Sequence, residues 1–382
     1  MLKLLLLCLS FALITDAKTV CLNMIVKNEA HVMERCLKPL KGLIDYWVIV
    51  DTGSTDSTRE VIKEFMKDVP GELHERPWVD FGHNRTEALN LAKDKADFIL
   101  FMDADENLVF EKDFALPSLE KDCYYITVYN SLFGGQRTFL INSALDWKWE
   151  GAMHEALICS QMKTSEALTN VKVETSSDGN RSRDPKKYLK DAAVLEEMLE
   201  KDPTNTRHMF YLAQSYHNAG EFPLAVKNYK KRAAMHGGWN KEIFWSFLAA
   251  AKLQQHLKEP AEIFIRDYNK SYESDKTRAE PLFYIADYFH GQENYALSYL
   301  ITKAALEIPL PNDGMFVESW IYEYGLTLDC ANAAAQMGKY EEAKTLYEKV
   351  LACKTLPENY QREASSTLEL IKTHIHKINK EK

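Results

Sequence analysis

The chain has 382 residues, of which 46% are hydrophobic and 27% are charged, a composition typical of a folded protein long enough for two domains. Its 47 basic and 56 acidic residues give a net charge of −9, so we expect no nucleic-acid partner and no general attraction to an anionic membrane. The seven cysteines are odd in number and show no C-x-x-C spacing, which argues against a disulfide framework and a structural zinc site.

Residues 1–17, "MLKLLLLCLSFALITDA", form an apolar leader. One lysine precedes the apolar run, and Ala17 is a small residue at which a signal peptidase would cut. The run from Leu4 to Ile14 is too short to cross a bilayer. A signal peptide and an N-terminal extension both remain open. The cysteine pattern favours a cytoplasmic location, whereas a true signal would make the protein secretory or membrane-anchored.

Residues 18–182 alternate between strand and helix patterns. Apolar strands at "TVCLNMIV", "YWVIVD" and "FILFM" are separated by the helical segments "HVMERCLKPLKGL", "REVIKEFMKD" and "GHNRTEALNLAKDKA". Such alternation predicts an α/β domain with a Rossmann-like, mostly parallel sheet that is covered on both faces. Two further strands are predicted at "YYITVYN" and "RTFLINS", with Gly134 and Gly135 marking a hairpin between them.

Acidic residues follow three of these strands. Asn28 and Glu29 come after the first, Asp51 opens the turn "DTGSTDST" after the second, and Asp103 and Asp105 come after "FILFM". In a parallel sheet, ligands bind at the carboxyl ends of the strands. We therefore expect all three clusters to face one crevice.

Two carboxylates spaced by one residue, as in Asp103 and Asp105, provide the hard oxygen ligands that a divalent cation prefers. A cation held there would bridge the oxygens of a diphosphate. Taken alone, a D-x-D sequence is more often a turn or a helix cap, and Asp51 with Gly53 also fits an Asx turn. Three acidic clusters at one edge, however, repel one another unless a cation or a donor-rich ligand is present.

After "SSDGNRSRDP", where we place the domain boundary, residues 186–382 show only helical patterns. The segments "FYLAQSYHNAGEFPLAVKNYKKRAA" and "CANAAAQMGKYEEAKTLYEKVLA" carry the small and aromatic residues through which tetratricopeptide hairpins nest, and "PLFYIADYFHGQENYALSYLITKAALE" is a degenerate copy. These segments predict an all-α, tetratricopeptide-like domain that grips an acceptor or a protein partner. An unrelated helical bundle is the alternative, because two clear copies are fewer than repeat stability requires.

The segments "MIVKNEA", "VIVDTGSTDST" and "FMDADE", in this order, resemble the nucleotide-sugar half of a family-2 glycosyltransferase with the GT-A fold. The resemblance covers residues 19–182, and "WEGAMHEAL", "DGNRS" and the repeats further resemble a bacterial subgroup in which such a domain precedes helical repeats. It implies a metal-dependent, inverting transferase that uses Mn²⁺ or Mg²⁺. The enzyme would move sugar from a nucleoside diphosphate sugar to an acceptor glycan, lipid or protein.

The resemblance also implies roles for single residues. Glu29 and Asp51 would contact the nucleoside, Asp103 would lie near the ribose and the metal, and Asp105 would ligate the metal. Arg85 matches an arginine of the donor pocket, where it would pair with phosphate or brace the acidic residues.

His154 and Glu155 in "GAMHEAL" are candidates for the second half of the site. An imidazole is a common metal ligand, and a carboxylate is able to take the proton of an acceptor hydroxyl, so we assign metal binding to His154 and the catalytic base to Glu155. Neighbours on one strand point to opposite faces, so both or only one of the two would serve the site. Arg181 in "DGNRS" is expected to bind substrate. Members of the resembling subgroup carry a histidine where this chain has Thr175, so either His154 serves the metal alone here or the metal is held more weakly.

Two other functions stay open from the sequence alone. One is a catalytically inactive nucleotide-binding platform on a tetratricopeptide scaffold, against which the intact acidic clusters weigh. The other is a nucleotidyltransferase, which shares a strand-end nucleotide site but uses a glycine-rich, basic first loop that is absent after "CLNMIV".

Overall fold

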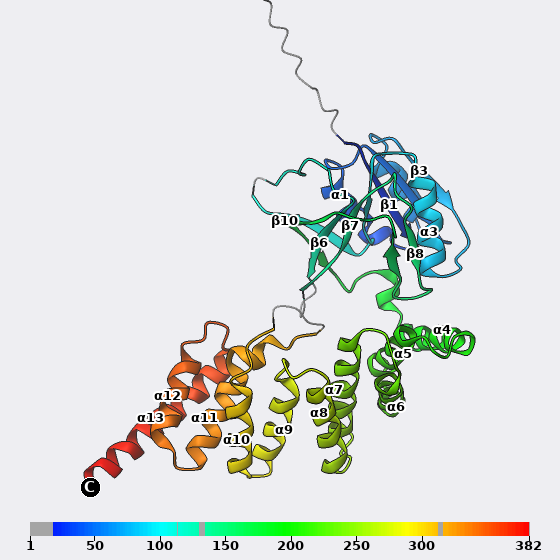
Figure 1. Ribbon diagram of the computed structural model, residues 1–382. Helices are drawn as coiled ribbons and strands as arrows, with labels where there is room; N and C mark the ends of the chain where they lie inside the picture. The colour runs from blue at the N-terminus through cyan, green and yellow to red at the C-terminus, as the bar shows by residue number, and fades with distance from the viewer. Residues whose placement is uncertain (1–17, 113, 130–133, 312–315, 382) are drawn as a thin grey trace, which may run out of the picture. The chain divides into compact units, whose positions relative to one another are not determined.

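The structure is a computed structural model that describes residues 18–112, 114–129, 134–311 and 316–381 (Figure 1). The predicted leader at residues 1–17 lies outside this range. The chain divides into two compact units, Met1–Pro185 and Lys186–Lys382, and each is described here by itself. No helix in the described ranges is long and apolar enough to cross a membrane.

The N-terminal unit is built on a sheet whose strand order is β3-β2-β1-β4-β7-β6-β10-β5 in the described part of the chain. These strands are β1 (Val20–Val26), β2 (Tyr46–Asp51), β3 (Gly71–Glu75), β4 (Phe98–Phe101), β5 (Glu106–Phe110), β6 (Cys123–Tyr129), β7 (Gly134–Asn142) and β10 (Ser165–Thr175). Strands β8 (Lys148–Glu150) and β9 (Ala156–Ile158) form a separate hairpin. The helices are α1 (Ala30–Leu40), α2 (Thr58–Phe65) and α3 (Phe81–Ala92), and a short 3₁₀ turn is η1 (Asn180–Arg183).

Strands β1 to β4 form the parallel half of this sheet, with β1 between β2 and β4 and with β3 beside β2. The other half is mixed, because β7 runs antiparallel to both β4 and β6, whereas β10 is parallel to β6 and antiparallel to β5. The predicted α/β class with a mostly parallel sheet is therefore confirmed. The predicted pairing of "YYITVYN" with "RTFLINS" also occurs, as β6 with β7.

Alternating side chains of the parallel strands supply two cores, one on each face of the sheet. Leu22 and Met24 of β1 pack with apolar residues of α1 and α2 on one face. Cys21 of β1 and Val48 of β2 pack with Leu89 of α3 on the other. Because side chains alternate along a strand, a continuously apolar sequence is required where helices cover both faces.

The C-terminal unit contains helices only, each packed against the next along the chain (Figure 1). They are α4 (Lys187–Lys201), α5 (Thr206–Asn218), α6 (Phe222–Ala234), α7 (Asn240–His256), α8 (Ala261–Ser274), α9 (Glu280–Gly291), α10 (Tyr295–Ala305), α11 (Leu326–Gln336), α12 (Tyr340–Leu351) and α13 (Glu358–Glu381), with a π-helical turn, η2 (Ile321–Gly325), before α11.

The same tight turn recurs between the helices of successive pairs. Gly220, Lys258, Glu293 and Gly338 each have a positive φ, between 58° and 80°, at the end of α5, α7, α9 and α11. In the first turn, Gly220 N donates to His217 O at 3.0 Å, and the N–H of the next residue donates to the carbonyl oxygen five residues before it. The other three turns repeat these two hydrogen bonds. The helices therefore form repeated hairpins, which confirms the predicted helical-repeat fold class.

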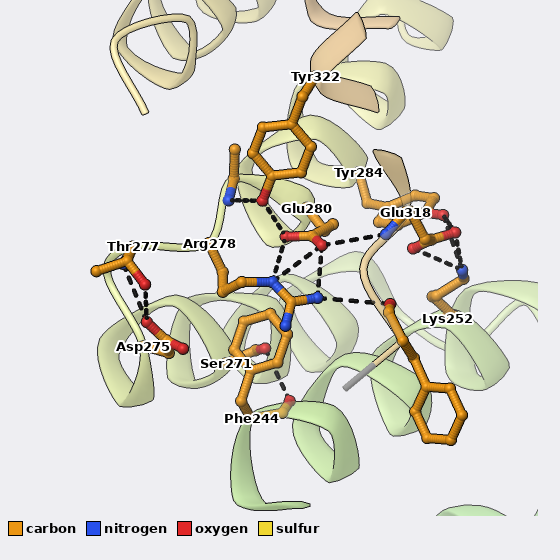
Figure 2. Close-up of polar contacts among 12 residues, drawn as sticks. Phe244, Lys252, Ser271, Asp275, Thr277, Arg278, Glu280, Tyr284, Glu318 and Tyr322 are labelled. Atoms are coloured by element: carbon orange, nitrogen blue, oxygen red, sulfur yellow. Dashed lines mark hydrogen bonds and ion pairs between the residues drawn. The ribbon is translucent and has the colours of Figure 1, made fainter. Parts of the chain in front are cut away.

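A buried ion pair fastens the segment before η2 to α9 (Figure 2). Arg278 and Glu280 are 1% and 0% exposed, and Arg278 Nε lies 3.0 Å from both carboxylate oxygens of Glu280. The hydroxyl of Tyr322 donates to Glu280 at 2.6 Å, and the backbone N of Glu318 donates to it at 3.4 Å. The Glu318 carboxylate in turn pairs with Lys252 of α7 at 3.0 Å. This cluster links three separate segments of the helical unit.

Candidate functional site

The acidic residues singled out in the sequence lie at one edge of the sheet. The order β3-β2-β1-β4 makes the carboxyl ends of these parallel strands neighbours. Asp51 is the last residue of β2, Glu29 lies three residues after the end of β1, and Asp103 lies two residues after the end of β4. This edge is where α/β sheets bind ligands.

Two loops at this edge are fastened to each other. Asn28 has a φ of 57°, a left-handed conformation that asparagine tolerates better than most residues. In this conformation its backbone N donates to Ser54 Oγ at 2.8 Å, and its side-chain Oδ1 accepts from Thr55 N at 2.7 Å. The loop after β1 is thereby held against the loop after β2.

Asp51 makes a turn with only one of its carboxylate oxygens. Oδ1 accepts hydrogen bonds from Gly53 N at 2.9 Å and from Ser54 N at 2.8 Å, which is the Asx turn that the sequence allowed. The residue is 1% exposed, and Oδ2 is buried with no hydrogen-bond partner among the described residues. Because a buried carboxylate oxygen is costly to leave unpaired, Oδ2 is a preformed acceptor for a ligand N–H or O–H.

Asp103 is shared between two arginines. Its Oδ1 lies 2.7 Å from Arg85 Nη2, and its Oδ2 lies 3.6 Å from Arg137 Nη1. Burial acts to raise the pKa of the Asp103 carboxyl, but the two guanidinium groups outweigh it and hold this pKa below its usual value. Asp103 is therefore an anion balanced by cations of α3 and β7.

Arg137 and its second partner, Glu106, are not among the residues predicted from the sequence. Arg137 Nη1 donates to Glu106 Oε1 at 2.7 Å, and burial together with the nearby Asp103 raises the pKa of Glu106 to about 6. In the antiparallel ladder Phe98 pairs with Asn142, and the same register continued along the two strands places Arg137 opposite Asp103. The sequence predicted both strands, "FILFM" and "RTFLINS", but not that they pair, so this contact had no local signal.

Arg85 also holds Glu155, the predicted base. Arg85 Nε lies 2.6 Å from Glu155 Oε1, so one guanidinium joins Asp103 to Glu155. Of the two roles expected for Arg85, the structure shows the bracing of acidic residues.

The loop that carries Glu155 lies on the first turn of α3. Phe81 N donates to Ala152 O at 3.1 Å, and a Cβ added to Gly82 would come within 2.4 Å of Gly151 O. The backbone of α3 and that of the loop are therefore in contact at two glycines, Gly82 and Gly151. His154, next to Glu155, is exposed and has a φ of 52°, a left-handed conformation that is uncommon for residues other than glycine.

Residues 176–183, which we call the strap, pass across the edge at Asp105. Ser176 Oγ donates to Asp105 O at 2.7 Å, and Asn180 N donates to both carboxylate oxygens of Glu29 at 3.1 Å. A Cβ on Gly179 would lie 2.7 Å from Asp105 Oδ2, so only glycine permits this approach. Burial, with the nearby Asp105 carboxylate, raises the pKa of Glu29 to about 7.

The strap is fixed at both ends by side chains of the flanking helices. Arg35 of α1 forms an ion pair with Asp178 at 2.6 Å, and His31 Nε2 lies 2.7 Å from Asp178 O. At the other end, the guanidinium of Arg181 lies 4.7 Å from the centre of the Phe81 ring at the start of α3. The predicted substrate-binding Arg181 thus lies beside the loop that carries Glu155.

The three predicted metal ligands, Asp103, Asp105 and His154, do not form a recognisable metal centre by themselves. Within the described ranges of the chain, no group of three or more His, Cys, Asp and Glu side chains is arranged to hold a metal ion. The metal site therefore stays a prediction.

Comparison with known proteins identifies a family for the N-terminal unit. Residues 21–154 match the family described as "Glycosyl transferase family 2", so this part of the chain carries a domain of that family. The glycosyltransferase SunS of Bacillus subtilis is 25% identical over 232 residues, which cover 57% of this chain and 54% of that protein. An uncharacterised glycosyltransferase of Rickettsia bellii is 34% identical over 84 residues, which cover 22% of this chain and 26% of that protein. The chain thus spans about half the length of SunS and less of the second relative.

Solved structures with helical repeats also match part of the chain. MamA is 12% identical with a TM-score of 0.36, and the match covers 49% of this chain and 96% of MamA. A tetratricopeptide repeat protein of Parabacteroides merdae is 16% identical with a TM-score of 0.38, and the match covers 50% of this chain and 69% of that one.

Proposed function

We propose that this chain, whose residues 21–154 carry a family-2 glycosyltransferase domain, transfers a sugar from a nucleoside diphosphate sugar to an acceptor. The observation that carries this proposal is Asp51, whose Oδ2 is buried without a hydrogen-bond partner at the carboxyl edge of the sheet. Its Oδ1 already completes the turn, so Oδ2 would accept a hydrogen bond from the nucleoside. Glu29 follows the neighbouring strand, β1, at the same edge.

The diphosphate would lie between Asp51 and Glu155, past Asp103 and Asp105. A divalent cation, Mn²⁺ or Mg²⁺, would suit this edge, because hard carboxylate oxygens meet here: burial and the nearby Asp105 carboxylate together raise the pKa of Glu29. Asp105 and Glu29 would hold this cation, since Asp103 is already balanced by two arginines. When bound, the cation would supply positive charge to the departing diphosphate.

Transfer would take place beside Glu155. As the acceptor oxygen forms a bond to the anomeric carbon, its proton would pass to the Glu155 carboxylate, and the bond from that carbon to the diphosphate oxygen would break. The electron pair would leave with the diphosphate, and a single displacement inverts the anomeric centre. Arg85 would keep Glu155 in place through the 2.6 Å contact. The helical unit, with its repeated hairpins, would recognise the acceptor or a protein partner.

The substitution Asp51→Asn tests this proposal without removing the turn. The asparagine oxygen would still accept from Gly53 N and Ser54 N, but an NH₂ group would replace Oδ2. We expect UDP or GDP to bind about 10- to 150-fold more weakly by calorimetry, since a hydrogen bond to a charged group contributes about 1.5–3 kcal/mol.

Asp45→Asn is the matched control, because Asp45 Oδ2 accepts from Val20 N at the opposite edge of the sheet. This variant should bind nucleotide as the wild type does. A screen of nucleotide sugars for Mn²⁺-dependent hydrolysis would then identify the donor and distinguish an enzyme from an inactive platform. If Asp51→Asn binds every nucleoside diphosphate as tightly as the wild type, the proposed nucleoside site is wrong.

A further inference from the structure

A large aromatic side chain is exposed to solvent at the same edge of the sheet. Trp78 lies in the connection between β3 and α3 and is 42% exposed, and the next residue, Val79, is also exposed. A single exposed apolar residue needs no explanation by itself. Trp78 differs from an ordinary surface residue in how firmly its backbone is held.

The buried side chain of Asn84 clamps the backbone on both sides of Trp78. Val79 N donates to Asn84 Oδ1 at 2.9 Å, and Asn84 Nδ2 donates to Pro77 O at 3.0 Å. Asn84 is fully buried in the first turns of α3, and Pro77 has a fixed φ. The peptide groups before and after Trp78 are therefore fixed by one buried amide.

The indole packs against the ring of Phe81. The Phe81 ring meets it edge to face, with centroids 4.8 Å apart and an angle of 82° between the planes. Asp80 caps α3 by accepting from His83 N at 2.7 Å, which fixes the helix start that carries Phe81. Trp78 is thus both exposed and preorganised, as expected for a side chain that binds a ligand.

The position of Trp78 relative to Asp51 indicates which part of a ligand it would meet. Arg76 N donates to Asp51 O at 2.9 Å, so the end of β3 lies directly beside the end of β2. Trp78 follows Arg76 by two residues, and the chain spans at most roughly 7 Å over that interval. A planar ring that donates to Asp51 Oδ2 would be within reach of the indole.

We propose that Trp78 is the platform on which the nucleobase of the donor stacks, while the Asp51 carboxylate pairs with a polar group of the same nucleoside. This inference rests on the proposed function, since it names a further donor-binding residue of that site. Stacking on an aromatic side chain tolerates any base, so Trp78 supplies affinity and Asp51 supplies selectivity.

The test compares ligands that contain a base with one that does not. UDP, GDP and inorganic pyrophosphate are titrated by calorimetry in the presence of Mn²⁺ into the full chain and into Trp78→Ala. We expect Trp78→Ala to bind UDP and GDP roughly 5- to 150-fold more weakly and to bind pyrophosphate as the wild type does. Trp78→Phe, which keeps an aromatic ring, should recover most of the affinity for both nucleotides.

Trp239 provides a matched control, because it is a 50% exposed tryptophan in the helical unit. Trp239→Ala should change none of the three affinities. Nucleotide should also quench part of the tryptophan fluorescence in the wild type and in Trp239→Ala, and this quenching should be lost in Trp78→Ala.

The outcomes separate this inference from the proposed function. If the wild type binds nucleotide and Trp78→Ala binds it equally well, Trp78 is not the platform, although the donor site stands. Equal affinity with slower sugar transfer would instead assign Trp78 to the acceptor. If Trp78→Ala weakens the binding of pyrophosphate as much as the binding of UDP, the indole acts through the local structure and the stacking role is wrong. A wild type that binds no nucleoside diphosphate would contradict the proposed function itself.

Discussion

Removing the Glu280 carboxylate should destabilise the helical unit strongly. In Glu280→Ala, the guanidinium of Arg278 would stay buried at 1% exposure without the carboxylate that lies 3.0 Å from its Nε, and the Tyr322 hydroxyl would lose its 2.6 Å acceptor. Breaking a buried ion pair by removing one partner costs about 3–5 kcal/mol. For a unit of about 200 residues, this loss corresponds to a decrease of about 6 to 20 °C in the melting temperature.

Differential scanning calorimetry of the full chain measures this effect, because the two units can unfold in separate transitions. The control is Glu369→Ala, which breaks a 2.8 Å pair with Lys372 in which the side chains are 73% and 44% exposed. That change should cost less than about 1 kcal/mol.

A second variant distinguishes the stability lost through an unpaired buried charge from the stability lost with the contact itself. Replacing both Arg278 and Glu280 by methionine removes the pair without leaving a buried ion, so much of the stability should return. The reasoning is refuted if Glu280→Ala melts within about 2 °C of Glu369→Ala, since the buried pair would then contribute no more than a surface pair.

Three other predictions concern the metal, a buried carboxyl and the division between the units. Asp105→Ala should abolish Mn²⁺-dependent donor hydrolysis but leave the melting temperature nearly unchanged, because Asp105 is partly exposed; full activity would contradict the proposed cation site. Burial and the nearby Asp287 raise the pKa of Asp329 from its ordinary value of 3.8 to about 7. The neutral carboxyl therefore contributes its full stability to the fold below pH 3.8, and this contribution is lost as the pH rises through 7. Asp329→Asn should therefore melt above the wild type at pH 8, with a difference that shrinks towards pH 5; a constant difference would show that Asp329 does not titrate there. A chain that ends at Pro185 should keep nucleotide binding and a cooperative melting transition but transfer sugar poorly; unimpaired transfer would mean that the repeats do not recognise the acceptor.

The elements with strong local patterns could be predicted from the sequence. The continuous apolar runs of β1, β2 and β4 require helices on both faces, and the glycine turns at Gly220 and Gly338 mark two helical hairpins. Strand β3, "GELHE", escaped prediction because it is short and polar at the edge of the sheet. The hairpin turn at Lys258 escaped because a lysine adopts the left-handed conformation that glycine usually signals. The hairpin that turns at Glu293 was predicted only as a degenerate copy, and its turn likewise lacks a glycine.

The candidate site shows the same division between local and distant information. Asp51 and its turn lie within one short segment, so the sequence could indicate both the turn and a ligand role. The contact of Arg137 with Asp103 depends on the pairing of β4 with β7, and the ion pair of Arg35 with Asp178 depends on where the strap crosses the sheet. Neither has a local pattern, because each depends on which distant segments become neighbours.

The contact between Gly82 and Gly151 limits how the loop that carries Glu155 can change. A methyl group at residue 82 would come within 2.4 Å of the Gly151 carbonyl oxygen, and Gly151 itself has a φ of 106° that other residues rarely adopt. A larger residue at either position would displace the loop and move Glu155 away from Arg85. Engineering of this loop should therefore keep both glycines fixed and vary residues around them, because a library that randomised these two positions would mainly sample variants in which Glu155 is displaced.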